Sequence, residues 1–179
     1  NNAGHTIKIK DKIYKLNLLP SGIIRGKKCI IGNGVVLDPW ALEYEINQLT
    51  SQNILINESN LLIAENICLI LPIHRIIDEL NEKSRGFEKI GTTKKGIGPA
   101  YEDKVGRRSI RLCDLDDNEL LRKKINSLLD FHILRLNKNN IEINSTELFK
   151  KLKIINQFIK KYVHPTWKIL NELSNKNET

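Results

Sequence analysis

The sequence has few of the residues that build covalent links or metal sites. Its three cysteines, Cys29, Cys68 and Cys113, are odd in number and far apart. It contains no C-x-x-C pair and no Cys/His spacing of the zinc type, which argues against a structural zinc site and a disulfide framework. We therefore expect reduced, buried thiols, as in a cytosolic protein.

Long apolar runs and aromatic platforms are also missing. The longest apolar run, Ile67–Ile73, contains Pro72 and is far shorter than the roughly 18 residues of a membrane span. The first residues are polar and lack the apolar segment of a signal peptide. Aromatic residues make up only 6% of the chain and do not alternate with basic ones, as they do in single-stranded nucleic-acid binders. These absences predict a cytoplasmic protein with no membrane and no nucleic acid among its partners.

The composition is that of a globular chain with a basic balance. The 179 residues are 40% hydrophobic and 28% charged, with a net charge of +8, which suits a single domain with a sizeable core. A basic balance can indicate nucleic acid, an anionic surface or phosphorylated small ligands. The abundance of Lys, Ile and Asn is instead typical of an AT-rich genome. One alternative for the basic balance is an RNA-binding domain, whose affinity for RNA would fall steeply as the salt concentration rises.

Strands are expected in the first third of the chain. Thr6–Lys10 alternates in the period of a half-buried strand, and Ile13–Leu19 follows it after a hairpin turn at Asp11 and Lys12. Cys29–Ile31 is a further apolar run, and Gly32–Gly34 follows it. That Gly-Asn-Gly sequence predicts either a hairpin or a point of close backbone approach beside a buried parallel strand.

Helices alternate with strands and then take over. Asp38 and Pro39 form a good helix start, an N-cap acceptor followed by Pro at the first helical position. After Leu115 the apolar spacing is helical throughout. The pattern indicates an α/β class with a helical part, residues 1–115 and 116–179 of one domain. Further helices are expected over His74–Lys83, Ala100–Val105, Leu120–Ile133, from Ser145, and over Trp167–Leu173; Asn53–Ala64 and Leu69–Leu71 are expected to hold strands.

The most informative segment is 91–108, GTTKKGIGPAYEDKVGRR. It combines four glycines, two threonines and two adjacent arginines, which is the chemistry of a phosphate-binding loop. It is not a Walker A loop, because Ile97 stands where Lys is required. It is not the dinucleotide pattern either, because Tyr101 stands in place of the third Gly. The alternative is a plain surface loop whose glycines make turns.

A few side chains could do chemistry. His5 follows Gly4 in NNAGHT, where an imidazole could act as a general acid toward a phosphate; the alternative is a solvated histidine near a terminus. For His74, His132 and His164 a structural role is favoured. Pairing with Arg107 or Arg108, or solvation, is favoured over acid–base work for the group Glu102, Asp103 and Lys104.

Four segments together resemble the adenylosuccinate synthetase family. They are NNAGHT, LLPSGIIRG, IGNGVVLDP and GTTKKGIGPAYEDKVGRR, in the family's order and spacing. The resemblance is dense over residues 1–115 and weaker over the helical residues 116–179. It implies a partial central sheet of the P-loop NTPase-related α/β fold, followed by a helical subdomain, and a homodimer.

The resemblance also implies a reaction. The family is a ligase of purine and AMP biosynthesis, which joins IMP to L-aspartate with GTP and Mg²⁺ through 6-phosphoryl-IMP. An Asp base takes the N1 proton, O6 attacks the γ-phosphate, a His acts as acid at the phosphates, and the amine of aspartate then displaces the new phosphate.

Roles are implied for the residues around His5. His5 matches the catalytic acid, and the carbonyl of Gly4 matches a Mg²⁺ ligand. The positions that match GTP contacts are Gly4, His5 and Thr6. The positions that match IMP contacts at this end are Asn2, Ala3, Gly4 and His5.

Two more roles are implied within 91–108. Thr93 matches a threonine that binds the phosphate of IMP. Arg107 matches an arginine that reaches across the dimer into the partner subunit's IMP site. Arg108 receives no role from the resemblance.

The family pattern is incomplete here. Its G-D-E-G-K-G-K loop, with the Asp base, a Lys at the phosphates and a second Mg²⁺ ligand, would precede Asn1, and its guanine-reading and aspartate-binding segments would follow the helical part. We therefore expect a central fragment that does not catalyse the reaction alone. The alternative is a non-catalytic nucleotide-binding or dimerisation module of the same fold.

Overall fold

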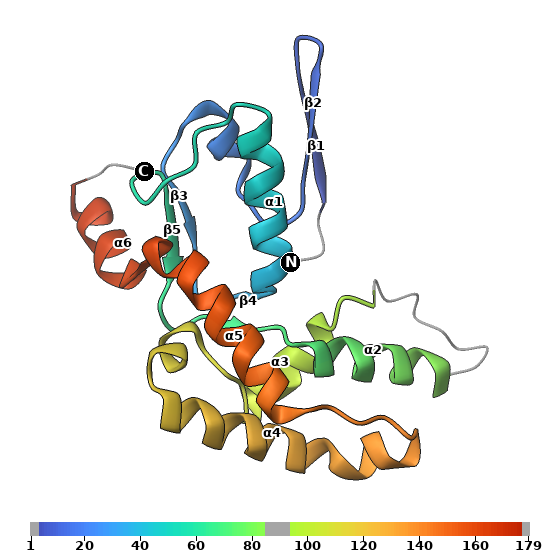
Figure 1. The fold of residues 1–179 in the computed structure, drawn as a ribbon. Coiled ribbons are helices and arrows are strands. Elements are labelled where there is room, and N and C mark those ends of the chain that lie inside the picture. Colours follow the sequence, from blue (N-terminus) through green and yellow to red (C-terminus); the bar gives the residue numbers. More distant parts are fainter. Residues whose placement is uncertain (1–3, 85–93, 177–179) are drawn as a thin grey trace. The chain divides into compact units, whose positions relative to one another are not determined.

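The computed structural model describes residues 4–84 and 94–176, and it divides the chain into two compact units (Figure 1). The first unit holds residues 1–67 and 158–179, and the second holds residues 68–157. The boundary expected at residue 115, between an α/β part and a helical part, stays a prediction.

The first unit is organised by a three-stranded parallel sheet. Its strands are β3 (Cys29–Ile31), β5 (Leu61–Ala64) and β7 (Val163–His164), in the order β3-β5-β7. All four residues of the central strand β5 are buried, which is typical of parallel strands covered on both faces. The α/β class expected from the sequence is thereby confirmed.

The sheet decides between the two interpretations of Gly32–Gly34. The strand before it, β3, pairs in parallel with β5, with Cys29 opposite Leu61. The segment after it contains β4 (Val36–Leu37), which does not pair with β3. The hairpin interpretation is therefore wrong, and the glycines follow a buried parallel strand.

The hairpin at the start of the chain is confirmed. Strand β1 (His5–Ile9) pairs antiparallel with β2 (Lys12–Leu16), and His5 lies opposite Leu16. The turn lies one residue earlier than expected, because Ile9 pairs with Lys12 and Lys10 takes a positive φ of 51°.

Helix α1 (Pro39–Ser51) begins where the sequence predicts. The carboxylate of Asp38 accepts a hydrogen bond from the N–H of Ala41 at 2.9 Å, which satisfies one of the free donors of the first turn. Leu42, Ile46 and Leu49 are buried along one face. A short 3-10 helix, η1 (Ser21–Arg25), precedes β3.

The second unit is mainly helical. Leu121, Ile125 and Leu128 of one helix are buried, as helical spacing predicts. The N-cap of this helix is Asp117, whose carboxylate accepts from the N–H groups of Glu119 and Leu120. The elements are β6 (Cys68–Leu69), α2 (Pro72–Ser84), α3 (Ile97–Val105), η3 (Leu112–Asp116), α4 (Asn118–Lys138) and α5 (Ser145–Ile159), the last of which ends in the first unit.

The end of the chain returns to the sheet, which the sequence did not predict. After α5 come η4 (Lys160–Tyr162), β7 and α6 (Thr166–Asn175). Strand β7 has only two residues, and Pro165 ends it. Such a short strand has no periodicity of its own, and only its partner β5 defines it.

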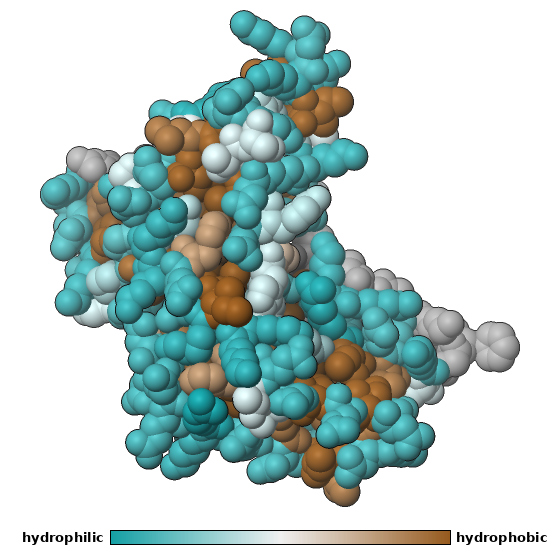
Figure 2. Space-filling view, in the orientation of Figure 1, coloured by the Kyte–Doolittle hydropathy of each residue, from teal (hydrophilic) through white to brown (hydrophobic). Residues whose placement is uncertain are grey.

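The cysteines and the surface agree in part with expectation. All three thiols are free, and Cys29 and Cys68 are buried, but Cys113 is exposed, contrary to expectation. Within residues 4–84 and 94–176, no helix is both long and apolar enough to cross a membrane. The visible face is mostly hydrophilic, with scattered apolar patches (Figure 2).

One buried carboxylate holds the segment between β2 and η1. Glu45 of α1 is 4% exposed. Its two oxygens accept hydrogen bonds from the backbone N–H groups of Asn17, Leu18 and Leu19, at 3.0 to 3.3 Å. These donors have no strand partner in this segment, so the carboxylate replaces a sheet ladder.

We expect Glu45→Gln to destabilise the full-length protein by about 2 kcal/mol, because one carboxylate oxygen becomes a donor that faces buried N–H groups. Urea unfolding measures the loss. The control is Glu43→Gln, a partly exposed residue of the same helix, which should change stability by less than about 0.5 kcal/mol. Equal effects of the two changes would contradict this account of Glu45.

Candidate functional site

The predicted site residues fall in different parts of the structure. Gly4, His5 and Thr6 lie together in the first unit, where the chain enters β1. Arg107 lies in the second unit, directly after α3. The remaining predicted positions, Asn2, Ala3 and Thr93, lie outside the described residues.

Gly4 lies against the end of the Asn17 side chain. A Cβ atom there would lie 2.9 Å from Oδ1 of Asn17, closer than ordinary contacts allow. Asn17 is itself held by the hydrogen bond from its N–H to Glu45. Glycine has no side chain of its own that would keep a ligand away from the backbone at this position.

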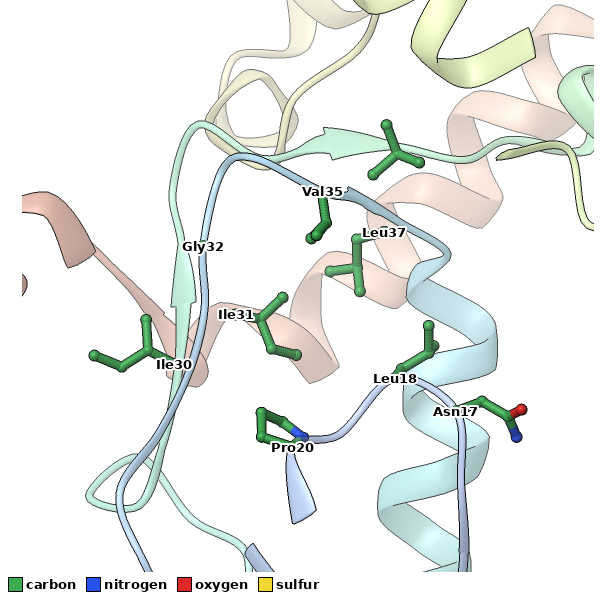
Figure 3. A pocket seen from close by; sticks show the side chains of 9 residues that line it. Asn17, Leu18, Pro20, Ile30, Ile31, Gly32, Val35 and Leu37 are labelled. Atoms are coloured by element: carbon green, nitrogen blue, oxygen red, sulfur yellow. The ribbon is translucent and has the colours of Figure 1, made fainter. Parts of the chain in front are cut away.

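A small hollow lies at the carboxyl end of β3, where ligands often bind in parallel sheets. Its volume is about 220 Å³, below the roughly 300 to 1,000 Å³ of ligand pockets. Leu18, Pro20, Ile31 and Leu37 surround it, whereas the amide of Asn17 points away from these apolar side chains (Figure 3). The hollow is too small and too apolar to hold a nucleotide by itself.

The glycine-rich segment is anchored to α2 at Gly96. This residue has a φ of 75°, and a Cβ atom there would lie 2.7 Å from the backbone of His74 and Arg75. Its N–H donates to the carboxylate of Asp78 at 2.9 Å. Glycine is therefore required twice, for the left-handed backbone and for the close approach to α2.

A buried carboxylate, Asp103, lies at the centre of the second unit. The residue is fully buried. His132 contacts its Oδ2 through Nε2 at 2.9 Å, and Nε2 of His74 lies in looser contact with the same oxygen at 3.3 Å. Arg108 donates from Nε to Oδ1 at 2.7 Å. The pairing of Asp103 with Arg108 is one of the alternatives that the sequence left open.

These contacts keep Asp103 ionised. Burial alone would raise the pKa of Asp103, but the contacts with His132, His74 and Arg108 outweigh it and lower the pKa well below its ordinary value. Nδ1 of His74 accepts from the N–H of Leu71 at 2.9 Å, so the neutral imidazole carries its hydrogen on Nε2, toward Asp103. A cluster of this kind ties α2, α3 and α4 together.

Arg107 takes an unusual backbone conformation. Its φ is 59°, a left-handed value that is costly for residues with a side chain. The N–H of Arg108 donates to the carbonyl of Asp103 and the N–H of Arg107 to that of Lys104, the bond pattern of a Schellman helix end. Arg107 therefore occupies the C′ position, where glycine is usual, and its side chain is exposed.

The comparisons with known proteins identify the family. The family model for adenylosuccinate synthetase matches residues 1–179. The chain belongs to the adenylosuccinate synthetase family. The resemblance to this family and the P-loop-related fold, both stated from the sequence, are thereby confirmed.

Relatives cover the chain almost completely. The adenylosuccinate synthetase of Wolbachia pipientis wMel is 50% identical over 175 residues, which are 97% of this chain and 41% of that protein. The one from Wolbachia of Brugia malayi is 49% identical over 174 residues, 96% of this chain and 40% of that protein. The chain thus spans about two fifths of the length of these curated relatives.

A solved structure supports the same assignment. The structure titled fully ligated adenylosuccinate synthetase from Plasmodium falciparum is similar to this chain with a TM-score of 0.83 and 30% identity. The similarity covers 98% of this chain and 41% of that one.

The contacts around Asp103 were not predicted from the sequence. The sequence favoured structural roles for His74 and His132. It did not indicate their partner, because residues so far apart share no local pattern. Segment 91–108 did contain one signal for these contacts, namely the glycine at position 106, directly before Arg107 and Arg108. A Cβ atom on Gly106 would overlap the guanidinium of Arg108, so this glycine makes room for the fold of Arg108 back toward Asp103.

We expect Arg107→Gly to give a more stable full-length protein than Arg107→Ala, by about 1 kcal/mol. Both changes remove the guanidinium, but only glycine adopts the left-handed conformation without a Cβ conflict. Urea unfolding of the two variants measures the difference. An alanine variant as stable as the glycine variant would show that the turn is not held left-handed.

Proposed function

We propose that the full-length protein joins IMP to L-aspartate with GTP, giving adenylosuccinate, GDP and phosphate, a ligase reaction of purine biosynthesis. The observation that carries the proposal is the unbroken family match over residues 1–179, with relatives about half identical to this chain. The match includes His5, Thr93 and Arg107, the residues for which the resemblance implies contact with substrates.

The proposed chemistry has two steps. O6 of IMP attacks the γ-phosphorus of GTP, so that GDP leaves and 6-phosphoryl-IMP forms. The amine of aspartate then attacks C6 and expels inorganic phosphate. Both steps spread negative charge over phosphate oxygens, and positioned donors stabilise that charge without reorganising.

The first unit would supply the acid and part of both nucleotide contacts. In this proposal His5 donates a proton at the phosphates, Gly4 to Thr6 contact GTP, and Asn2 to His5 contact IMP. The pairing of His5 with Leu16 in the hairpin supports a fixed backbone here. A fixed backbone lets a general acid act at a defined atom.

The proposed metal is Mg²⁺, held in part by the carbonyl of Gly4. Among residues 4–84 and 94–176 no group of three or more His, Cys, Asp or Glu side chains could hold a metal ion. A single backbone carbonyl nevertheless fits Mg²⁺, which takes few protein ligands and completes its shell with water and substrate phosphates. When bound, the ion neutralises phosphate charge.

The second unit would act across a homodimer. Within the described chain the Arg107 side chain is exposed, and so are the apolar side chains of Val105, two residues earlier, and of Phe131, whose ring contacts the neighbouring Arg108. Exposed apolar residues around an arginine are typical of an interface. This supports a dimer in which Arg107 reaches the partner subunit's IMP. In the same proposal Thr93 binds the IMP phosphate, as the resemblance implies. The cytoplasmic location stays a prediction.

We expect the full-length protein to form adenylosuccinate only when IMP, aspartate and GTP are all present, with one GDP and one phosphate per product. His5→Asn should lower kcat by about 10²- to 10⁴-fold, because a general acid is lost. Product formation is followed by its absorbance and by chromatography. A full-length protein that makes no adenylosuccinate would refute the proposed function, and an undiminished His5→Asn variant would refute the acid role.

Arg107→Leu should raise KM for IMP about tenfold or more, because a charge-assisted contact to phosphate is lost. If the arginine serves the neighbouring site, mixing this variant with His5→Asn subunits should restore about a quarter of the wild-type activity, from heterodimers with one intact site. The control is Arg122→Leu, an exposed arginine that stacks on Phe149, which should keep wild-type kinetics. No restoration would indicate a local role.

A further inference from the structure

The left-handed turn at Arg107 needs a cause. A non-glycine residue with positive φ costs about 1 to 2 kcal/mol and persists only where its surroundings fix it. The C′ position of a helix accepts glycine readily, so helix termination alone does not explain an arginine there. An arginine at this position supplies a guanidinium group, which a glycine could not.

Asp103 fixes the turn through both its backbone and its side chain. Its carbonyl accepts the N–H of Arg108 at 2.9 Å, which closes the turn around Arg107. Its Oδ1 accepts the Nε of the same Arg108 at 2.7 Å. The two bonds lie on either side of the Arg108 Cα, so that residue cannot rotate without breaking one of them.

The arginine that follows is held on its other face as well. The guanidinium of Arg108 stacks on the ring of Phe131 at 3.8 Å, and its Nη1 donates to the carbonyl of Gly106 at 3.3 Å. Gly106 leaves room for this fold, since a Cβ atom there would overlap the guanidinium. Arg108 is thus a clamp, and Arg107, directly before it, is the exposed residue.

The carboxylate is in turn fixed from the two neighbouring helices. His74 of α2 and His132 of α4 both face Oδ2, and α2, α3 and α4 belong to one compact unit (Figure 1). Opposite charge and directed N–H groups hold an orientation that apolar contacts would leave loose.

We propose that Asp103 is a positioning residue for IMP binding: with His74, His132 and Arg108 it holds the turn that presents Arg107 to the partner subunit's site. The proposal rests on the proposed function, in which Arg107 acts across the dimer. It makes Asp103 affect the neighbouring active site rather than the site of its own subunit.

The first test is kinetic, in the full-length enzyme. Asp103→Asn keeps the shape of the side chain and removes its charge, so it should raise KM for IMP about tenfold and leave KM for GTP within about twofold. In an Arg107→Leu background the same change should have no further effect on KM for IMP. Additive effects would overturn the proposal. Glu102→Gln, an exposed neighbour on α3, is the charge-matched control and should behave as wild type.

The second test separates the two subunits. Asp103→Asn subunits mixed with His5→Asn subunits should recover about a quarter of the wild-type activity, because the intact His5 is then served by a partner with an intact turn. A residue that only maintains its own subunit would give no recovery. If the Arg107→Leu mixture recovers and the Asp103→Asn mixture does not, the proposal fails and the proposed function stands. If neither recovers, the action of Arg107 across the dimer fails, and this inference fails with it.

A second variant tests the proposal if Asp103→Asn does not fold. Arg108→Gln leaves the buried contacts of Asp103 with both histidines in place and removes only the partly exposed clamp, whose side chain is 26% exposed. Circular dichroism and the mass of the dimer verify folding. Arg108→Gln subunits are then mixed with His5→Asn subunits. We expect activity to recover, and an absence of recovery would overturn the proposal.

Discussion

The second unit depends on one ionised carboxylate, that of Asp103. The residue is fully buried, and an unpaired charge in the interior would be very unfavourable. Arg108 and His132 make hydrogen bonds to its two oxygens, and His74 lies in contact with one of them. Because these partners come from α2, α4 and the chain after α3, the charge can be satisfied only when three helices are in place together. Pairing of the carboxylate therefore requires one particular arrangement of these helices.

The strained turn is a local consequence of that arrangement. A left-handed arginine is unfavourable by itself, and a helix end with glycine would form more easily. The turn persists because Arg108 is held at both its backbone and its side chain by Asp103. The position thus combines a feature that opposes folding with a charged side chain left exposed, which is the combination expected where backbone geometry serves a ligand.

Local signals in the sequence predicted local structure well. Asp38 with Pro39 located the start of α1, the alternation of Thr6–Lys10 located the first hairpin, and helical spacing located α4. Strand β7 could not be predicted, since two residues carry no period and their partner lies about a hundred positions earlier. The contacts of Asp103 could not be predicted for the same reason. His74 and His132 are distant from it in sequence, and a single sequence shows no link among the three residues.

The two units use the same physical solution for the segments that match the family. Glu45 holds the backbone of residues 17–19 in the first unit, and Asp103 holds the turn at Arg107 in the second. Apolar packing resists separation but tolerates rotation, whereas a carboxylate that accepts several N–H groups also fixes direction. Nucleotide phosphates are recognised by directed donors. A buried carboxylate behind each segment is therefore better suited than a larger apolar core to hold residues 17–19 and the turn at Arg107 in fixed orientations.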